Sequence, residues 1–152
     1  MRFLCFKHER IYAQQPDEHL MEQWNSWMHS AGVCYDCGDW SKAASFVGSA
    51  FDLAKIRLSR NNDARADAMA QVTLSGIYLA NIFQHMGHLC ESRHTLQTAG
   101  DCLNCFAATD DAACADELRA CLEDAGLREQ LIGRFLKLPY RACGWAWRSR
   151  LH

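Results

Sequence analysis

The chain has 152 residues, 49% of them hydrophobic, and a formal net charge of −2. This length fits one domain spanning residues 1–152, and the apolar fraction excludes a disordered tail. A charge so close to zero gives no indication of nucleic-acid binding, and no apolar run approaches the about 20 residues of a membrane span.

The chain is predicted to be all-α. Its two prolines, Pro16 and Pro139, lie near the two ends and leave the whole middle without one. Helices exclude proline from their interiors, whereas a β-sandwich or barrel is expected to contain frequent Gly/Pro turns. Helix formers such as Ala, Leu, Met and Glu dominate the middle of the chain. We therefore expect about six helices.

Residues 1–16 are predicted to form an N-terminal arm that docks on the bundle, either extended or as part of a short helix. The first hairpin is expected to span residues 17–60. Its first helix begins near Asp17 and carries an apolar stripe with the three-four spacing of a helix. Gly38 ends that helix, and Asp39 can cap the second, which continues to about Leu58.

The second hairpin is predicted to span residues 63–106. Its first helix, from about Ala64 to Met86, is apolar on more than one side, which is typical of a helix between two neighbours. Gly87 ends this helix, and the next runs from about Leu89 to Cys105. A third hairpin is expected over residues 110–138, with Gly126 at its turn.

Residues 139–152 form a tail with several arginines and tryptophans. Between residues 127 and 152 there are six Lys/Arg and one acid, whereas residues 101–126 hold seven acids and one arginine. The tail could contact an anionic partner, a membrane surface or nucleic acid. The alternative is that its tryptophans dock on the bundle while its arginines pair with the acidic segment.

The segments around Gly38 and Gly87 share one pattern, 49 positions apart. Small residues recur at the same offsets, where two helices would approach closely: Ala31 with Ala80, and Ala50 with Ala99. This pattern resembles the tetratricopeptide repeat over roughly residues 24–105. The family's usual period is about 34 residues, so the helices here are expected to be longer. The resemblance implies antiparallel hairpins stacked as a right-handed bundle.

The resemblance also implies a groove lined by the first helix of each hairpin, which binds a peptide or helix of a partner protein. By offset, the groove-facing residues are Asn25, Met28 and Tyr35 in the first hairpin and Ile77, Asn81 and Gln84 in the second. Met28 and Ile77 are apolar where family members that bind chaperone tails carry lysines, so no carboxylate clamp is expected. The alternative is that these residues pack on the N-terminal arm or the C-terminal tail.

The nine cysteines are an odd number in a chain large enough to have its own core. No signal peptide is recognised, because the apolar run near the start is too short. We therefore expect reduced thiols in the cytoplasm. The pairs Cys34/Cys37 and Cys102/Cys105 are predicted near helix C-termini, where the helix dipole disfavours a thiolate. The expected fold also separates the two pairs too far for a shared zinc site.

A different group remains a candidate metal site at the ends of the two hairpins. Its members are Cys34, Cys37, His85, His88 and Cys90. The alternative is that Cys34 packs in the core, where its apolar stripe would place it, and that the histidines are solvated caps.

No motif for a phosphate-binding loop, a nucleophile elbow or a zinc protease is present in the sequence. We therefore expect no enzyme and no cofactor. The predicted function is a protein-interaction module: an adaptor, chaperone or regulatory protein that binds a peptide or helix. The alternatives are a metal-binding sensor or enzyme that uses the Cys/His group, and a self-associating protein such as a homodimer.

Overall fold

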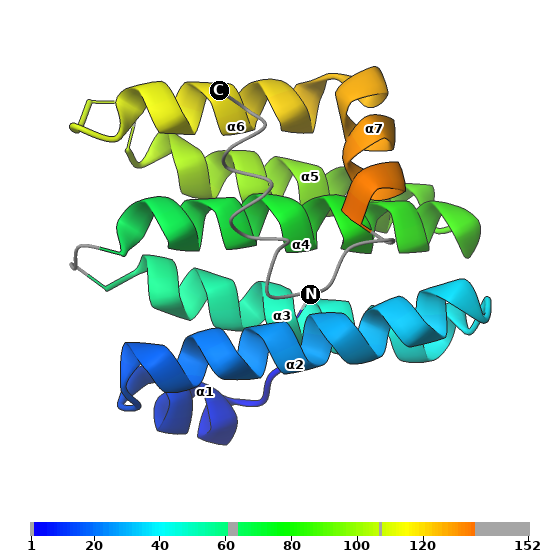
Figure 1. Cartoon of the computed structure of the whole chain (residues 1–152), viewed down its shortest axis with the longest axis horizontal. Helices are drawn as coiled ribbons and strands as arrows, with labels where there is room; N and C mark the ends of the chain where they lie inside the picture. The colour runs from blue at the N-terminus through cyan, green and yellow to red at the C-terminus, as the bar shows by residue number, and fades with distance from the viewer. Residues whose placement is uncertain (1, 61–63, 107, 136–152) are drawn as a thin grey trace.

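A computed structural model describes residues 2–60, 64–106 and 108–135, which form α-helices and no strand. The helices are α1 (Phe6–Ala13), α2 (Asp17–Asp36), α3 (Trp40–Leu58), α4 (Arg65–His85), α5 (Leu89–Asn104), α6 (Ala112–Glu123) and α7 (Ala125–Phe135). Helices α2 to α6 are stacked in chain order, and α7 runs across α5 from α6 to α4 (Figure 1). The all-α prediction is confirmed. None of the described helices is both long and apolar enough to cross a membrane.

The turns after α2 and α4 are built in the same way. Gly38 and Gly87 have φ angles of +73° and +78°, a region that other residues rarely adopt. The amide after each glycine donates to a carbonyl five residues earlier, at 2.9 Å in the first turn and 2.8 Å in the second. These bonds satisfy carbonyls that the helix end leaves unpaired. Each glycine therefore reverses the chain, as the sequence predicts.

Small residues allow α3, α4 and α5 to pack closely. Ala50 of α3, Ala80 of α4 and Ala99 of α5 are all buried. A Cβ added at Gly76 of α4 would lie 3.2 Å from the Ala99 Cβ and 3.3 Å from the Phe51 ring. A larger residue at position 76 would therefore push α3 or α5 away. Helix α4 is buried along most of its length, as its apolar sequence predicts.

A buried arginine joins α2, α3 and α4. Arg57 of α3 is 1% exposed, and its guanidinium donates from Nε and Nη2 to the two carboxylate oxygens of Asp17, at 2.8 and 2.9 Å. Its Nη1 donates to Gln71 Oε1 of α4 at 2.9 Å. The planar guanidinium fits such a paired arrangement. Arg57 therefore binds the beginning of α2 and the first half of α4 to the end of α3.

The N-terminal arm combines a short non-helical stretch, which bends at Phe3 and Leu4, with the short helix α1. The buried carboxylate of Asp52 accepts hydrogen bonds from the Phe3 and Leu4 amides at 2.7 and 3.0 Å. The Phe3 ring occupies the space that a side chain at Gly48 would take, because a Cβ there would lie 2.3 Å from the ring. Arg60 donates to the last two carbonyls of α1. Of the two alternatives for this segment, the short helix is the one observed, over Phe6–Ala13.

The break between α6 and α7 lies at Asp124 rather than at Gly126. Asp124 has extended backbone (φ −96°, ψ 113°), and its side chain accepts a hydrogen bond from the Leu127 amide at 3.0 Å. This side chain caps α7, so no left-handed residue is needed and Gly126 lies in the first turn of α7. Residues 136–138 and the predicted tail, 139–152, are outside the described part of the chain.

Candidate functional site

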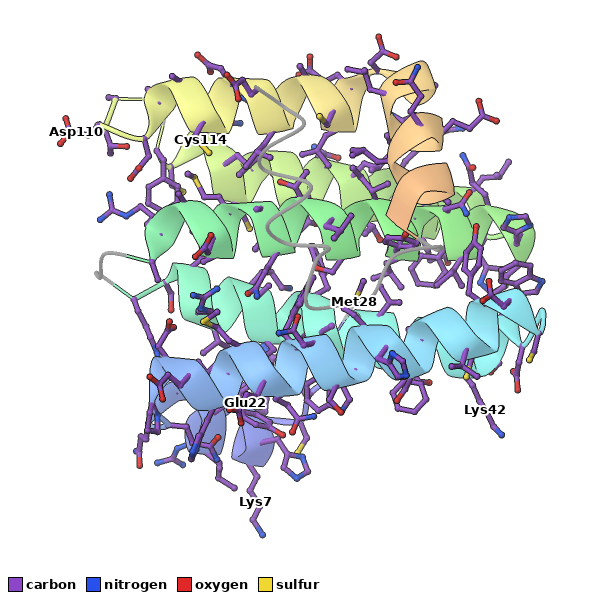
Figure 2. The ribbon with its side chains drawn as sticks, viewed as in Figure 1. Lys7, Glu22, Met28, Lys42, Asp110 and Cys114 are labelled. Carbon is purple, nitrogen blue, oxygen red and sulfur yellow. The ribbon has the colours of Figure 1, made fainter. Side chains whose placement is uncertain are left out.

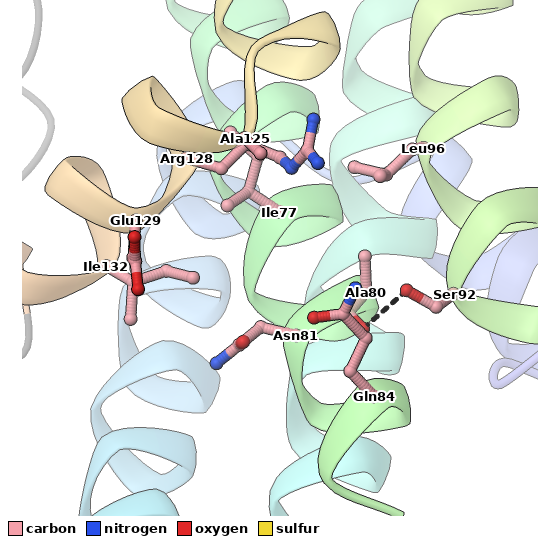
Figure 3. Close-up of a pocket in the computed structure, with 10 residues that line it drawn as sticks. All are labelled: Ile77, Ala80, Asn81, Gln84, Ser92, Leu96, Ala125, Arg128, Glu129 and Ile132. Carbon is pink, nitrogen blue, oxygen red and sulfur yellow. Dashed lines mark hydrogen bonds between the residues drawn. The ribbon is translucent and has the colours of Figure 1, made fainter. Parts of the chain in front are cut away.

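The candidate site is a pocket between α4, α5 and α7, here called the α4–α7 pocket (Figure 3). Its volume is about 260 Å³. It is lined by Ile77, Ala80, Asn81 and Gln84 of α4, Ser92 and Leu96 of α5, and Ala125, Arg128, Glu129 and Ile132 of α7. The lining residues of each helix recur at spacings of three and four, so each helix presents one face to the pocket.

The pocket has an apolar floor and a polar rim. Ile77, Leu96 and Ile132 supply branched aliphatic side chains from three helices. Ser92 Oγ donates to the Ala80 carbonyl at 2.8 Å, so this hydroxyl is already engaged (Figure 3). Gln84 is exposed at the rim and no hydrogen bond ties its amide to another described residue. An amide can both donate and accept, so Gln84 can pair with either side of a peptide group.

Helix α7 adds charge to one side of the pocket. The Arg128 guanidinium donates from Nη1 to the Leu122 carbonyl, near the end of α6. Glu129 is exposed beside it. The Tyr78 hydroxyl of α4 lies 3.5 Å from the Ile132 carbonyl and can donate to it. Arg128 and Tyr78 thereby connect α7 to α6 and α4, which holds its charged side chains over the apolar floor.

An aromatic cluster adjoins the pocket at the turn end of α2 and α4. The Asn81 amide donates to the Tyr35 hydroxyl, so α4 and α2 are joined beside the pocket. The Tyr35 ring lies edge-on to Trp40, with centroids 5.0 Å apart, and Trp40 stacks on His85 at 4.2 Å. Desolvation raises the pKa of the Tyr35 hydroxyl. It therefore stays a neutral donor and acceptor near pH 7.

The six predicted groove residues are divided between pocket, cluster and core. Ile77, Asn81 and Gln84 line the α4–α7 pocket, and Tyr35 reaches it through Asn81. Met28 is 2% exposed and belongs to the core, in contrast to Lys7 and Lys42, which extend away from the helices (Figure 2). Asn25 is half-buried on α2 and does not line the pocket. The predicted residues thus come together only in part.

Residues of α5 and α7 complete the pocket, and sequence reasoning did not select them. On α7, Ala125, Arg128, Glu129 and Ile132 follow the spacing of one helical face. That spacing was visible in the sequence, but nothing in it indicated that α7 turns across the bundle. The Asp124 cap is local, whereas the direction of α7 depends on its contacts with α4 and α6.

The predicted metal-binding group does not converge. Across the described residues, which include all five candidates, no three His, Cys, Asp or Glu side chains gather where they could hold a metal ion. His85 stacks on Trp40, and His88 lies beside the Phe83 ring with centroids 6.2 Å apart. Cys34 is half-buried, while Cys37 and Cys90 are exposed.

Comparison of the chain with protein-family models, with curated proteins and with solved structures finds no match.

Proposed function

We propose that this chain is a protein-interaction module that binds a peptide or helix of a partner protein in the α4–α7 pocket. The observation that carries the proposal is the convergence of three predicted groove residues, Ile77, Asn81 and Gln84, on one pocket. An adaptor, chaperone or regulatory role without catalysis or cofactor fits such a site. We further propose that the two hairpins are divergent tetratricopeptide-like units, since their turns and small residues correspond.

The dimensions of the pocket favour a side-chain anchor. Small-molecule sites commonly occupy about 300–1,000 Å³, and this pocket of about 260 Å³ lies below that range. The aliphatic floor suits one large apolar side chain of the partner, and such buried anchors carry much of the binding energy at protein interfaces. The Gln84 amide can then pair with the partner's backbone beside that anchor.

The aromatic cluster extends the proposed surface. Tyr35 and Trp40 are half-buried, and each has an apolar ring and a polar group. Tyrosine and tryptophan are enriched in interfaces for this reason. A peptide anchored in the pocket can therefore continue over Tyr35 and Trp40. The exposed free thiols of Cys37 and Cys90 suit a reducing compartment, so we place the proposed activity in the cytoplasm.

A matched pair of variants tests the proposal. Gln84 and Gln97 are both exposed glutamines, but only Gln84 lines the pocket. Peptides from a displayed random library are selected on the purified wild-type chain and then titrated against Gln84→Arg and Gln97→Arg. We expect Gln84→Arg to weaken peptide binding about tenfold or more, a loss that is usual for a residue central to an interface. The reason is that the arginine adds bulk at the pocket and places a second cation near Arg128.

The control Gln97→Arg adds the same charge outside the pocket and is expected to bind like the wild type. Circular dichroism of both variants verifies that they are folded. Equal binding by Gln84→Arg, or a library that yields no binding peptide, contradicts the proposal. Selected peptides that lack a large apolar residue contradict the proposal that one apolar side chain of the partner fills the pocket.

A further inference from the structure

A second pocket, here called the cationic pocket, lies at the other end of α4 and α5. Its volume is about 420 Å³. It is lined by Lys55, Leu58, Ser59, Arg60, Arg65, Cys102, Cys105 and Phe106, from the ends of α3 and α5 and the beginning of α4. Along α4, twelve residues separate Arg65 from Ile77, which is about 18 Å of helix. The two pockets are therefore separate sites.

Three cationic side chains line this pocket, and none of its described lining residues is acidic. Lys55 Nζ lies 3.1 Å from Asp52, whose other oxygen accepts the two backbone amides of the N-terminal arm. Arg65 Nη1 lies 3.4 Å from Asp111. Neither acid lines the pocket. Among the residues that the structure describes, the three cations thus form ion pairs with two carboxylates, which leaves one positive charge in excess.

Arg60 supplies that excess charge. Its Nη2 donates to the carbonyls of Tyr12 and Ala13, both at 2.8 Å, which holds the guanidinium in place. No carboxylate lies within ion-pair distance of Arg60 among the described residues. An arginine held by one nitrogen can still donate from the others to a carboxylate.

The remaining walls are apolar. Leu58 is buried, and the Phe106 ring lies beneath the Arg65 guanidinium, 5.1 Å from its carbon to the ring centroid. Cys102 is half-buried, and desolvation raises the pKa of its thiol, so this wall is neutral near pH 7. The neutral Cys102 thiol therefore adds no negative charge of its own, although Asp101 lies next to it in the chain, and an anion entering the pocket has apolar surface to cover.

We propose that the cationic pocket binds a small molecule with a single carboxylate on an apolar, aromatic-sized body. The carboxylate pairs with Arg60 and Lys55 and neutralises the excess charge. The apolar body lies against Leu58, Phe106 and the Cys102 thiol. The volume of about 420 Å³ falls in the range of about 300–1,000 Å³ that small-molecule sites commonly occupy.

A pair of probes that differ only in charge tests the binding. 2-Naphthoate and its neutral amide, 2-naphthamide, are titrated by calorimetry against the wild-type chain. We expect the naphthoate to bind about tenfold more tightly, the usual contribution of a charge-assisted hydrogen bond. Acetate, which has the charge without the body, is expected to bind more weakly than the naphthoate. Equal affinity for naphthoate and naphthamide, or for naphthoate and acetate, overturns the proposal.

Two lysines of α3 give a matched control. Lys55 and Lys42 both pair with an aspartate three residues earlier, but Lys42 is exposed far from this pocket. Lys55→Gln is expected to reduce the ratio of naphthoate affinity to naphthamide affinity to about threefold or less. Lys42→Gln is expected to leave this ratio unchanged. Gln84→Arg is also expected to leave it unchanged, so this proposal and the peptide-binding proposal can fail separately.

Thiol alkylation gives a second measurement that uses only the wild-type chain. Iodoacetamide, a neutral reagent, is applied with and without saturating naphthoate, and mass spectrometry follows each cysteine. Naphthoate is expected to slow alkylation of Cys102 and Cys105 at least threefold, with Cys37 and Cys90 unaffected. Unchanged rates at Cys102 and Cys105, or equal slowing at all four cysteines, overturn the assignment of the ligand to this pocket.

Discussion

Arg57 joins three helices through one buried side chain. Its charge is buried at 1% exposure, which is unfavourable unless the charge is paired and hydrogen-bonded. Asp17 takes two of its hydrogen bonds and Gln71 a third. An uncharged replacement would leave both acceptors without this partner. The hydrogen bonds from Arg57 therefore hold α2 and α4 against the end of α3.

Arg57→Gln tests this role. We expect the free energy of unfolding to fall by about 3 kcal/mol, the lower end for breaking a buried pair, because Asp17 retains 28% exposure and can be partly solvated. Urea unfolding followed by circular dichroism measures the change. Arg93→Gln, at an exposed arginine of α5, is the control and should stay within about 0.5 kcal/mol of the wild type. Equal losses in the two variants would contradict the role of Arg57.

At the scale of elements, the N-terminal arm and α1 depend on features of α3. Gly48 leaves room for the Phe3 ring, and Asp52 holds the amides of Phe3 and Leu4. Helix α1 itself buries no residue, so its own packing contributes little. A helix of eight residues is also too short to be stable alone. The hydrogen bonds of Phe3 and Leu4 before α1, and those of Arg60 to the last two carbonyls of α1, are therefore what keep it on the bundle.

Two glycines within helices allow this docking to be measured. In Gly48→Ala the new Cβ meets the Phe3 ring, so the arm must move; at Gly100 of α5 nothing lies within 4 Å. We expect the Phe3 and Leu4 amides to exchange hydrogen about tenfold faster in Gly48→Ala, because local opening becomes easier. Gly100→Ala should leave them unchanged and stabilise the chain by up to about 1 kcal/mol. Unaltered exchange in Gly48→Ala would argue against the arm contact.

For the whole molecule, the Arg57–Asp17 pair connects stability to pH. The hydrogen bond from Arg57 lowers the pKa of Asp17 below its ordinary 3.8, and partial desolvation opposes this change. A carboxyl whose folded-state pKa is lowered stabilises the fold at pH values above its unfolded-state pKa. That contribution is present at pH 7 and is lost progressively as the pH falls below about 4.

Asp17→Asn isolates this contribution. The free energy of unfolding of wild type and variant is compared by urea titration at several pH values from 7 down to 2.5. We expect the variant to be less stable at pH 7 and the difference to shrink steadily below about pH 4. A difference that stays constant over this range would mean that Asp17 does not titrate with a lowered pKa in the fold.

Helix positions were largely predictable because their signals are local. Gly38 and Gly87 take the left-handed conformation that ends a helix, and Asp39 caps α3 by accepting the Lys42 amide at 3.2 Å. Gly126 was assigned a turn wrongly because an aspartate cap two residues earlier performs the same task. A single sequence does not distinguish a turn at a left-handed glycine from a turn at an aspartate cap, since both end one helix and begin another.

The candidate site was predictable only where it lies on α4. Ile77, Asn81 and Gln84 share one face of a helix, and helical periodicity is enough to group them. Met28 of α2 was selected by the same helical periodicity, yet it is buried in the core. The packing of the helices decides which face of α2 a neighbour covers.

Periodicity, proline placement and turn glycines therefore determine that the chain is helical and where most of its helices begin and end, because they act within a few neighbouring residues. Other features join residues far apart in the chain: Arg57 is buried against Asp17, and the Phe3 ring packs against Gly48. The direction of α7 depends on how separate helices approach one another. Both pockets arise in this second way. Their walls come from helices whose relative placement is set by side-chain packing, which no local pattern encodes.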